Sequence, residues 1–450
     1  MPTRHMPTPT RSPRSGPSRS GPSRPGPTRW TRRRTESRTL LALSALSLAG
    51  AACSDPGTGP GEPVERITEL PRSLSVSEKA VIQAGNRFAA DLLRQVHAAA
   101  PDATTFLSPL SASMALGMTM NGAAGATRAQ MQEMLGFGDL PAEEINESYR
   151  DLIALLRDLD PRVDLDLANA IFHRASFVME EPFLDLTRTY FDATVEGVDF
   201  DDPGAADHIN AWVREATGDR IEGIVEPPID PLTMAFLMNA IYFKGDWTKE
   251  FDAADTYLGA FHLVDGTTAD ARFMTKEDTL SYRVADGWHA VEIPYGGGAW
   301  RMTVAVPLDT HGLDDVMDDL ETLLDPEAVW EERVMAIHLP RFELEWERVM
   351  NDDLKARGMT DAFSGAADFT PMYRNALTDG LHVKEVKQKT FLEVDELGTE
   401  AAAVTSVEMG VVCACGPPEL RADRPFLLAI RERLSGTVLF AGLIVEAPKE

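Results

Sequence analysis

Cysteine is scarce in this chain: its 450 residues include three, Cys53, Cys413 and Cys415. A disulfide framework is therefore excluded, and packing has to stabilise the fold. Cys413 and Cys415 are too close in sequence for an unstrained bridge. The nine histidines are scattered, and neither a CxxC nor an HExxH spacing occurs. The sequence predicts no metal site and no cofactor.

Basic residues are outnumbered by acidic ones, and the formal net charge is −28. Residues 1–53 hold ten arginines and a single acid, Glu36, so the remainder carries about −37. A chain this acidic repels phosphate and sulfate backbones, which makes nucleic acid and anionic polysaccharide poor partners. No basic helix face indicates a heparin-type cofactor.

The apolar run Leu40–Ala52 has thirteen residues and is too short to span a bilayer as a helix. It follows a segment rich in Pro, Ser, Arg and Gly that cannot form a core, and it is typical of an export signal. Cys53 comes next, as at a bacterial lipoprotein cleavage site, although Gly50 stands where Leu is usual. We expect an exported protein, either extracellular or anchored to the cell envelope through a lipid on Cys53.

The chain thus divides into three predicted parts. Residues 1–53 form a basic leader that ends in the export signal, and residues 54–73 form a tether of Pro, Gly and acidic residues. Residues 74–450 are expected to form one folded domain, acting as a monomer.

Hydrolase motifs are absent as well. No G-x-S-x-G occurs, and Ser364 lacks a glycine two residues later. The sequence therefore predicts that the protein is not an enzyme.

The segment Val394–Pro425 combines the composition of a loop with the alternation of a strand. Taken as a strand, one face from Thr399 to Met409 is small or apolar, whereas the other holds Glu400 and Glu408. An ordinary surface loop or a static strand would also fit this pattern. The combination suggests a loop that can become a strand.

Helical spacing dominates early in the chain and strand patterns dominate late, which predicts the α+β class. Ser75 or Ser77 can cap a helix that runs to about His97, and Pro109 suits the first turn of the next helix. The run Met234–Phe243 is apolar on both faces except at Asn239, which indicates a strand covered on both sides. Phe426–Ile430 and Val438–Val445 form a predicted hairpin.

Six ordered blocks of this chain resemble the serpin family, over about residues 74–447. They are Phe106–Ser111, Ile209–Val213 with Thr217, Asn239–Trp247, Leu339–Phe342 with Leu354–Phe363, Asp395–Thr405, and Pro425–Phe426 with Phe440–Gly442. The resemblance implies a fold of three β-sheets and about nine helices, with an exposed reactive-centre loop at about residues 396–424. It also implies an inhibitor that a target serine protease attacks as a substrate, forming a covalent acyl complex, before the cut loop inserts into the central sheet.

The hinge of this loop matches Glu396, Gly398, Thr399, Glu400, Ala401, Ala402 and Ala403. Thr399 and the alanines are small enough to be buried on insertion, while Glu400 projects to the other face. A proline or an inward-facing charge would obstruct insertion, and neither occurs between Leu397 and Val412. The hinge favours an inhibitor over a non-inhibitory relative.

Two further groups carry over from the resemblance. Ser108, Ser111 and Asn239 match the shutter, a polar cluster beneath the opening sheet, in which Gln388 replaces the family's usual histidine. Arg341 and Glu396 match a pair at the breach, where insertion begins, and Trp247 lies in that region. Each of these residues could equally be an ordinary core or surface contact.

Counted from Glu396 as in the family, the resemblance implies an attacked bond between Val412 and Cys413, within the range Val411–Ala414. Small uncharged residues there suit a shallow apolar pocket, as in elastase-like or subtilisin-like proteases. Papain-like cysteine proteases stay an alternative target, and a non-inhibitory binding or chaperone protein of the same fold is the alternative function.

Overall fold

The computed structural model describes residues 66–308, 312–373, 380–399 and 417–449. All of them belong to the second of the two units into which the chain divides, Pro60–Glu450. Several predicted sites lie outside the described residues, namely Cys53, Glu400, Ala401, Ala402, Ala403, Val412 and Cys413.

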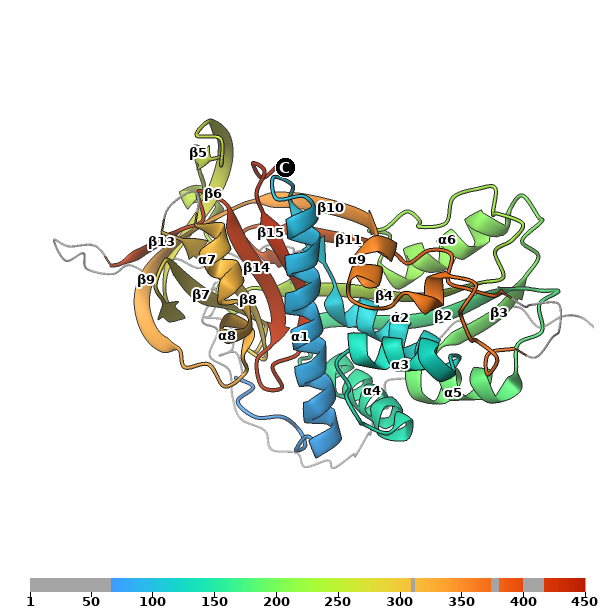
Figure 1. The fold of residues 1–450 in the computed structure, drawn as a ribbon. Coiled ribbons are helices and arrows are strands. Elements are labelled where there is room, and N and C mark those ends of the chain that lie inside the picture. Colours follow the sequence, from blue (N-terminus) through green and yellow to red (C-terminus); the bar gives the residue numbers. More distant parts are fainter. Residues whose placement is uncertain (1–65, 309–311, 374–379, 400–416, 450) are drawn as a thin grey trace, which may run out of the picture. The chain divides into compact units, whose positions relative to one another are not determined.

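Nine α-helices occur in the described ranges, and six of them precede the main run of strands (Figure 1). They are α1 (Val76–Ala99), α2 (Pro109–Asn121), α3 (Gly125–Met134), α4 (Ala142–Arg157), α5 (Glu181–Phe191), α6 (Ala205–Ala216), α7 (Leu313–Asp318), α8 (Leu320–Leu324) and α9 (Asn351–Ala356).

The described strands form three sheets. The strands are β1 (Thr105–Leu107), β2 (Val163–Arg174), β3 (Thr194–Val198), β4 (Ala235–Asp246), β5 (Tyr257–His262), β6 (Thr268–Val284), β7 (Trp288–Tyr295), β8 (Trp300–Pro307), β9 (Glu331–Pro340), β10 (Phe342–Val349), β11 (Lys387–Val394), β12 (Gly398–Thr399), β13 (Glu419–Arg421), β14 (Phe426–Glu432) and β15 (Val438–Ile444). The predicted α+β fold with three sheets and about nine helices is confirmed.

The largest sheet has nine strands in the order β1-β15-β14-β8-β7-β6-β9-β13, with β5 paired to β6. The second sheet runs β12-β4-β2-β3, and the third is the antiparallel pair β10-β11. The predicted C-terminal hairpin is β14 and β15, and all fourteen of its residues are buried. The hairpin therefore forms the centre of the core, where Phe440 stacks on Phe106 with ring centroids 5.3 Å apart.

Local signals set the first two helices. The hydroxyl of Ser75 accepts a hydrogen bond from the backbone N–H of Glu78, whose carboxylate accepts one from the N–H of Ser75. This capping box satisfies two N–H groups that the first turn leaves without partners. Pro109 occupies the first turn of α2, where its missing N–H costs nothing, directly after the N-cap Ser108.

Strand β4 is covered on both faces, as its sequence predicts: α6 packs on one face and α2 on the other (Figure 1). Most of its residues are nevertheless only half-buried. The reason lies at its edge, because among the described residues β4 and β11 belong to different sheets and do not pair. One edge of a strand in the middle of the molecule is thus left open.

Candidate functional site

The gap between β4 and β11, which we call the slot, contains two hollows of about 440 and 450 Å³, both including some open solvent. Ile241 on β4 and Phe440 on β15 line both hollows. Thr217 and Ile221, in the segment after α6, also line both of them. Side chains from these elements and from β11 therefore surround a space that no described strand fills along most of its length.

Strand β12, the first part of the predicted hinge, occupies the end of the slot beside the last residues of β4, which we call its upper end or top. Gly398 pairs with Asp246 and Thr399 with Gly245, antiparallel to β4. Thr399 is 4% exposed, and its hydroxyl lies 2.9 Å from the phenol oxygen of Tyr295. Its side chain therefore points into the core, as the alternation of the hinge predicts.

A tight turn, Asp395–Gly398, joins β11 to β12. The carboxylate of Asp395 accepts hydrogen bonds from the N–H groups of Leu397 (2.9 Å) and Gly398 (3.1 Å). The N–H of Asp395 donates to the carbonyl of Gly398, and the N–H of Trp247 donates to the carbonyl of Leu397. The hinge is thus fastened to the loop that follows β4 before it runs into the slot.

Glycine is required at position 398 because the backbone of β4 lies very close to its Cα. A Cβ added there would lie 2.2 Å from the carbonyl oxygen of Gly245 and 2.7 Å from the Cα of Asp246. Both neighbours are backbone atoms that cannot move aside, so only glycine fits at this position.

Trp247 is 1% exposed and combines packing with anchoring. Its ring stacks on Tyr295 at 4.4 Å, and its indole N–H donates to the carbonyl of Asp395 at 2.9 Å. The ammonium of Lys276 lies 5.7 Å from this ring and 4.3 Å from the ring of Phe251. Burial among these rings lowers the pKa of Lys276 to about 7, because the charged form loses its hydration.

The predicted breach pair is in contact. Arg341 Nη1 lies 3.1 Å from Glu396 Oε2, and the hydroxyl of Thr256 donates to Oε1 of the same carboxylate at 2.6 Å. The Glu396 side chain is 8% exposed and the Arg341 side chain is 37% exposed. A pair open to solvent on one side contributes about 1 kcal/mol or less.

The four predicted shutter residues lie together under the slot and form one chain of hydrogen bonds, in which the N–H of Ser111 donates to the hydroxyl of Ser108 at 3.4 Å. The amide of Gln388 accepts from the N–H of Ser108 (3.1 Å) and donates to its carbonyl (2.8 Å). The hydroxyl of Ser111 donates to the carbonyl of Asn239 at 3.3 Å. Gln388 therefore holds the start of α2 and is connected to Asn239 through Ser108 and Ser111.

The Asn239 side chain is only partly satisfied. Its NH₂ group donates to Oδ1 of Asn169 at 2.9 Å, while its own Oδ1 is buried and has no hydrogen-bond partner among the described residues. A buried acceptor without a partner costs about 1–3 kcal/mol. Because Asn239 lines one of the hollows, a group that entered the slot could supply the missing donor.

Sequence patterns did not identify several residues of this site, namely Tyr295, Thr256, and Arg220 and Glu393, which line the hollow next to Thr399. Tyr295 meets Thr399 across 104 positions of sequence, and Thr256 meets Glu396 across 140. No local pattern marks such a contact. A search for polar residues at the ends of apolar strands would have selected Tyr295, the last residue of β7.

Within the ranges that the structure describes, no group of three or more metal-ligating side chains is close enough to hold an ion. Among the same residues, no helix combines the length and the apolarity that crossing a bilayer requires.

The family model described as "Serpin (serine protease inhibitor)" matches residues 83–447. Iripin-5 of Ixodes ricinus is 34% identical over 372 residues, covering 80% of this chain and 93% of the relative. Serpin-Z1C of Triticum aestivum is 33% identical over 352 residues, covering 75% and 88%. The solved structure of human thyroxine-binding globulin superposes with a TM-score of 0.74 at 26% identity, covering 83% of this chain and 100% of that one.

Proposed function

The chain belongs to the serpin family, and from that premise we propose that it inhibits serine proteases by trapping them on an inserted loop. The observation that carries this proposal is the position of β12. Two hinge residues already occupy the top of the slot, and none of the described strands fills the slot beneath them.

The pairing register of β12 with β4 can be continued along β4 to predict where the following residues would lie. Continued residue by residue from Thr399 opposite Gly245, it would bring Ala401 opposite Phe243, Ala403 opposite Ile241 and Thr405 opposite Asn239. The inward positions of the hinge would thus be small residues above the core. The hydroxyl of Thr405 would face the unpaired Oδ1 of Asn239, where it could donate the missing hydrogen bond.

The trapping reaction needs no chemistry from this chain beyond a cleavable bond. The serine hydroxyl of the target attacks the carbonyl of Val412, and an ester forms as the Val412–Cys413 peptide bond breaks and its amine leaves. The freed strand then fills the slot before water hydrolyses the ester. About 15 residues at about 3.3 Å each would carry the acylated protease roughly 50 Å.

The target class follows from the residues beside the attacked bond. Val411, Val412 and Ala414 are small and uncharged, and an apolar S1 pocket accepts such side chains whereas an acidic pocket selects Arg or Lys. We therefore propose elastase-like or subtilisin-like proteases, met outside the cytoplasm after export.

A second candidate is a carrier or binding protein without inhibitory activity. Thyroxine-binding globulin, solved in complex with thyroxine, shares this fold, so the fold also serves binding. The same experiment separates the two functions, because only an inhibitor retains the protease covalently.

The test is a covalent complex with pancreatic elastase that survives boiling in SDS. We expect the wild-type chain to form it, and Thr399→Arg to be cleaved without forming it, since insertion would bury a charge where Thr399 is 4% exposed. Thr399→Ser is the matched control, because it keeps the hydroxyl that meets Tyr295. Clean cleavage of the wild-type chain, or full inhibition by Thr399→Arg, would contradict the proposal.

A further inference from the structure

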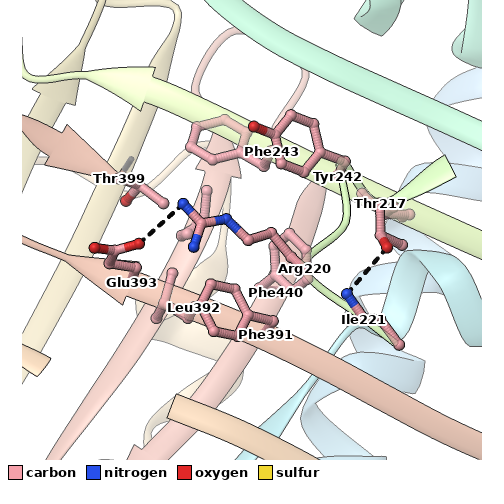
Figure 2. A pocket seen from close by; sticks show the side chains of 12 residues that line it. Thr217, Arg220, Ile221, Tyr242, Phe243, Phe391, Leu392, Glu393, Thr399 and Phe440 are labelled. Carbon is pink, nitrogen blue, oxygen red and sulfur yellow. Dashed lines mark hydrogen bonds and ion pairs between the residues drawn. The ribbon is translucent and has the colours of Figure 1, made fainter. Parts of the chain in front are cut away.

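The side chain of Arg220 crosses the slot directly below β12 (Figure 2). Its guanidinium lies between Tyr242 and Phe243 of β4 on one side and Phe391 and Glu393 of β11 on the other. Arg220 Nη2 is 3.1 Å from Glu393 Oε2, and the guanidinium carbon is 5.2 Å from the centroid of the Phe391 ring. The guanidinium is thus held against β11 by an ion pair and a cation–π contact.

The backbone that carries Arg220 is fastened to α6. The hydroxyl of Thr217 donates to the carbonyl of Val213 and accepts from the N–H of Ile221. The amide oxygen of Asn210 accepts from the N–H groups of Ile224 and Val225, on the far side of Arg220. The segment Thr217–Val225, which we call the strap, is therefore tied to the helix by hydrogen bonds at both of its ends.

The strap also touches β4. A Cβ on Gly218 would lie 3.1 Å from the ring of Tyr242, so the backbone at Gly218 runs close over this strand. Gly218 has a φ of +55°, a conformation that favours glycine. The strap thus packs on β4, and Arg220 extends from it to β11, so the two walls of the slot are linked through one side chain.

We propose that Arg220 is a gate, whose ion pair with Glu393 must open before residues beyond Thr399 can enter the slot. This inference rests on the proposed loop insertion. Residues 400–402, in the continued register, would pass the levels of Phe243 and Tyr242, where the guanidinium now lies. The gate slows insertion that is not driven by cleavage and so keeps the loop outside until a protease attacks it.

The test is the uptake of a synthetic peptide with the sequence of residues 399–412, followed by the change in native-gel mobility of the intact chain. We expect Arg220→Ala to take up the peptide about three- to ten-fold faster than wild type, the range for losing a contact of roughly 0.6–1.4 kcal/mol in the barrier. The charge swap Arg220→Glu with Glu393→Arg should restore the slow rate. Arg188→Ala is the matched control, because it removes a surface pair with Glu181 on α5.

Each outcome distinguishes the gate from the loop insertion on which it rests. Uptake by Arg220→Ala that is equal to or slower than wild type would overturn the gate while leaving the inhibitor function intact. Uptake by the swap variant as fast as by Arg220→Ala would show that the restored ion pair does not slow insertion. That result would also overturn the gate. A wild-type chain that takes up no peptide and traps no elastase would overturn the insertion mechanism and the gate together.

Discussion

At the scale of the residue, close contacts of Gly398 and Thr399 position β12 at the top of the slot. Gly398 fits because its backbone lies against Gly245, and Thr399 fits because its hydroxyl reaches Tyr295. Trp247 holds the turn that places both residues. These contacts hold Gly398 and Thr399 beside β4.

Gly398→Ala should expel β12 from the slot, because the added Cβ would meet a carbonyl oxygen at 2.2 Å. We expect a loss of about 1–3 kcal/mol in the free energy of unfolding and more cleaved chain per trapped protease, measured by denaturant unfolding and by the stoichiometry of inhibition. Gly85→Ala, where the added Cβ meets no atom within 4 Å, is the control. Unchanged stability and stoichiometry in Gly398→Ala would refute the packing argument.

The lowered pKa of Lys276 predicts that the stability of the fold depends on pH. Its pKa is about 7 in the fold, against the ordinary lysine value of about 10.5, so between these values the unfolded chain binds a proton that the folded chain does not. The contribution of Lys276 to folding therefore improves as pH rises from 7 towards 10.5 and is poorest below 7. Lys276→Met should reduce the rise of the melting temperature between pH 7 and 9, measured by differential scanning calorimetry. An identical pH profile in the variant would show that Lys276 is not the group responsible.

At the scale of the element, the site consists of two strands that do not meet. Strand β4 is paired along its whole length with β2, and β11 with β10, yet the facing edges of β4 and β11 remain without a shared ladder in the described structure. An open edge is normally a liability, since it invites another strand. Here α6 and the strap pack on β4 beside this edge.

At the scale of the whole molecule, the empty slot means that the described fold is not the one with the most main-chain pairing. On the proposed mechanism, a barrier would have to hold the loop outside, and the stability of the intact chain would be partly kinetic. Cleavage would then remove the constraint at one end of the loop and let the molecule move to the better-paired state.

Nicking the loop near Val412 should therefore raise the melting temperature. About ten new main-chain hydrogen bonds at about 0.5–1.5 kcal/mol each correspond to a rise of roughly 10 °C or more for a domain of this size. Calorimetry of intact and elastase-nicked chain measures it, with nicked Thr399→Arg as a control that is not expected to gain. An unchanged melting temperature after nicking of the wild-type chain would remove the driving force on which the mechanism depends.

Much of the fold was predictable because its signals are local. The Ser75 cap, Pro109 in the first turn of α2 and the alternation of the C-terminal hairpin each lie within a few residues of the element they specify. Strands β5 to β7 and helix α5 were not predicted from the pattern. Trp288–Tyr295, for example, is buried at almost every position, so it lacks the alternation of a half-exposed strand.

The sequence by itself determined the small, uncharged inward face of the hinge and the ordered family motifs, because both are properties of residue identity and spacing. Only the tertiary structure decided that Gln388 bonds Ser108, that Thr399 meets Tyr295 and that Arg220 crosses to Glu393. These contacts join residues more than a hundred positions apart, and their geometry depends on how sheets and helices pack. Residue identity limits what a side chain can bind, whereas packing selects the partner it reaches.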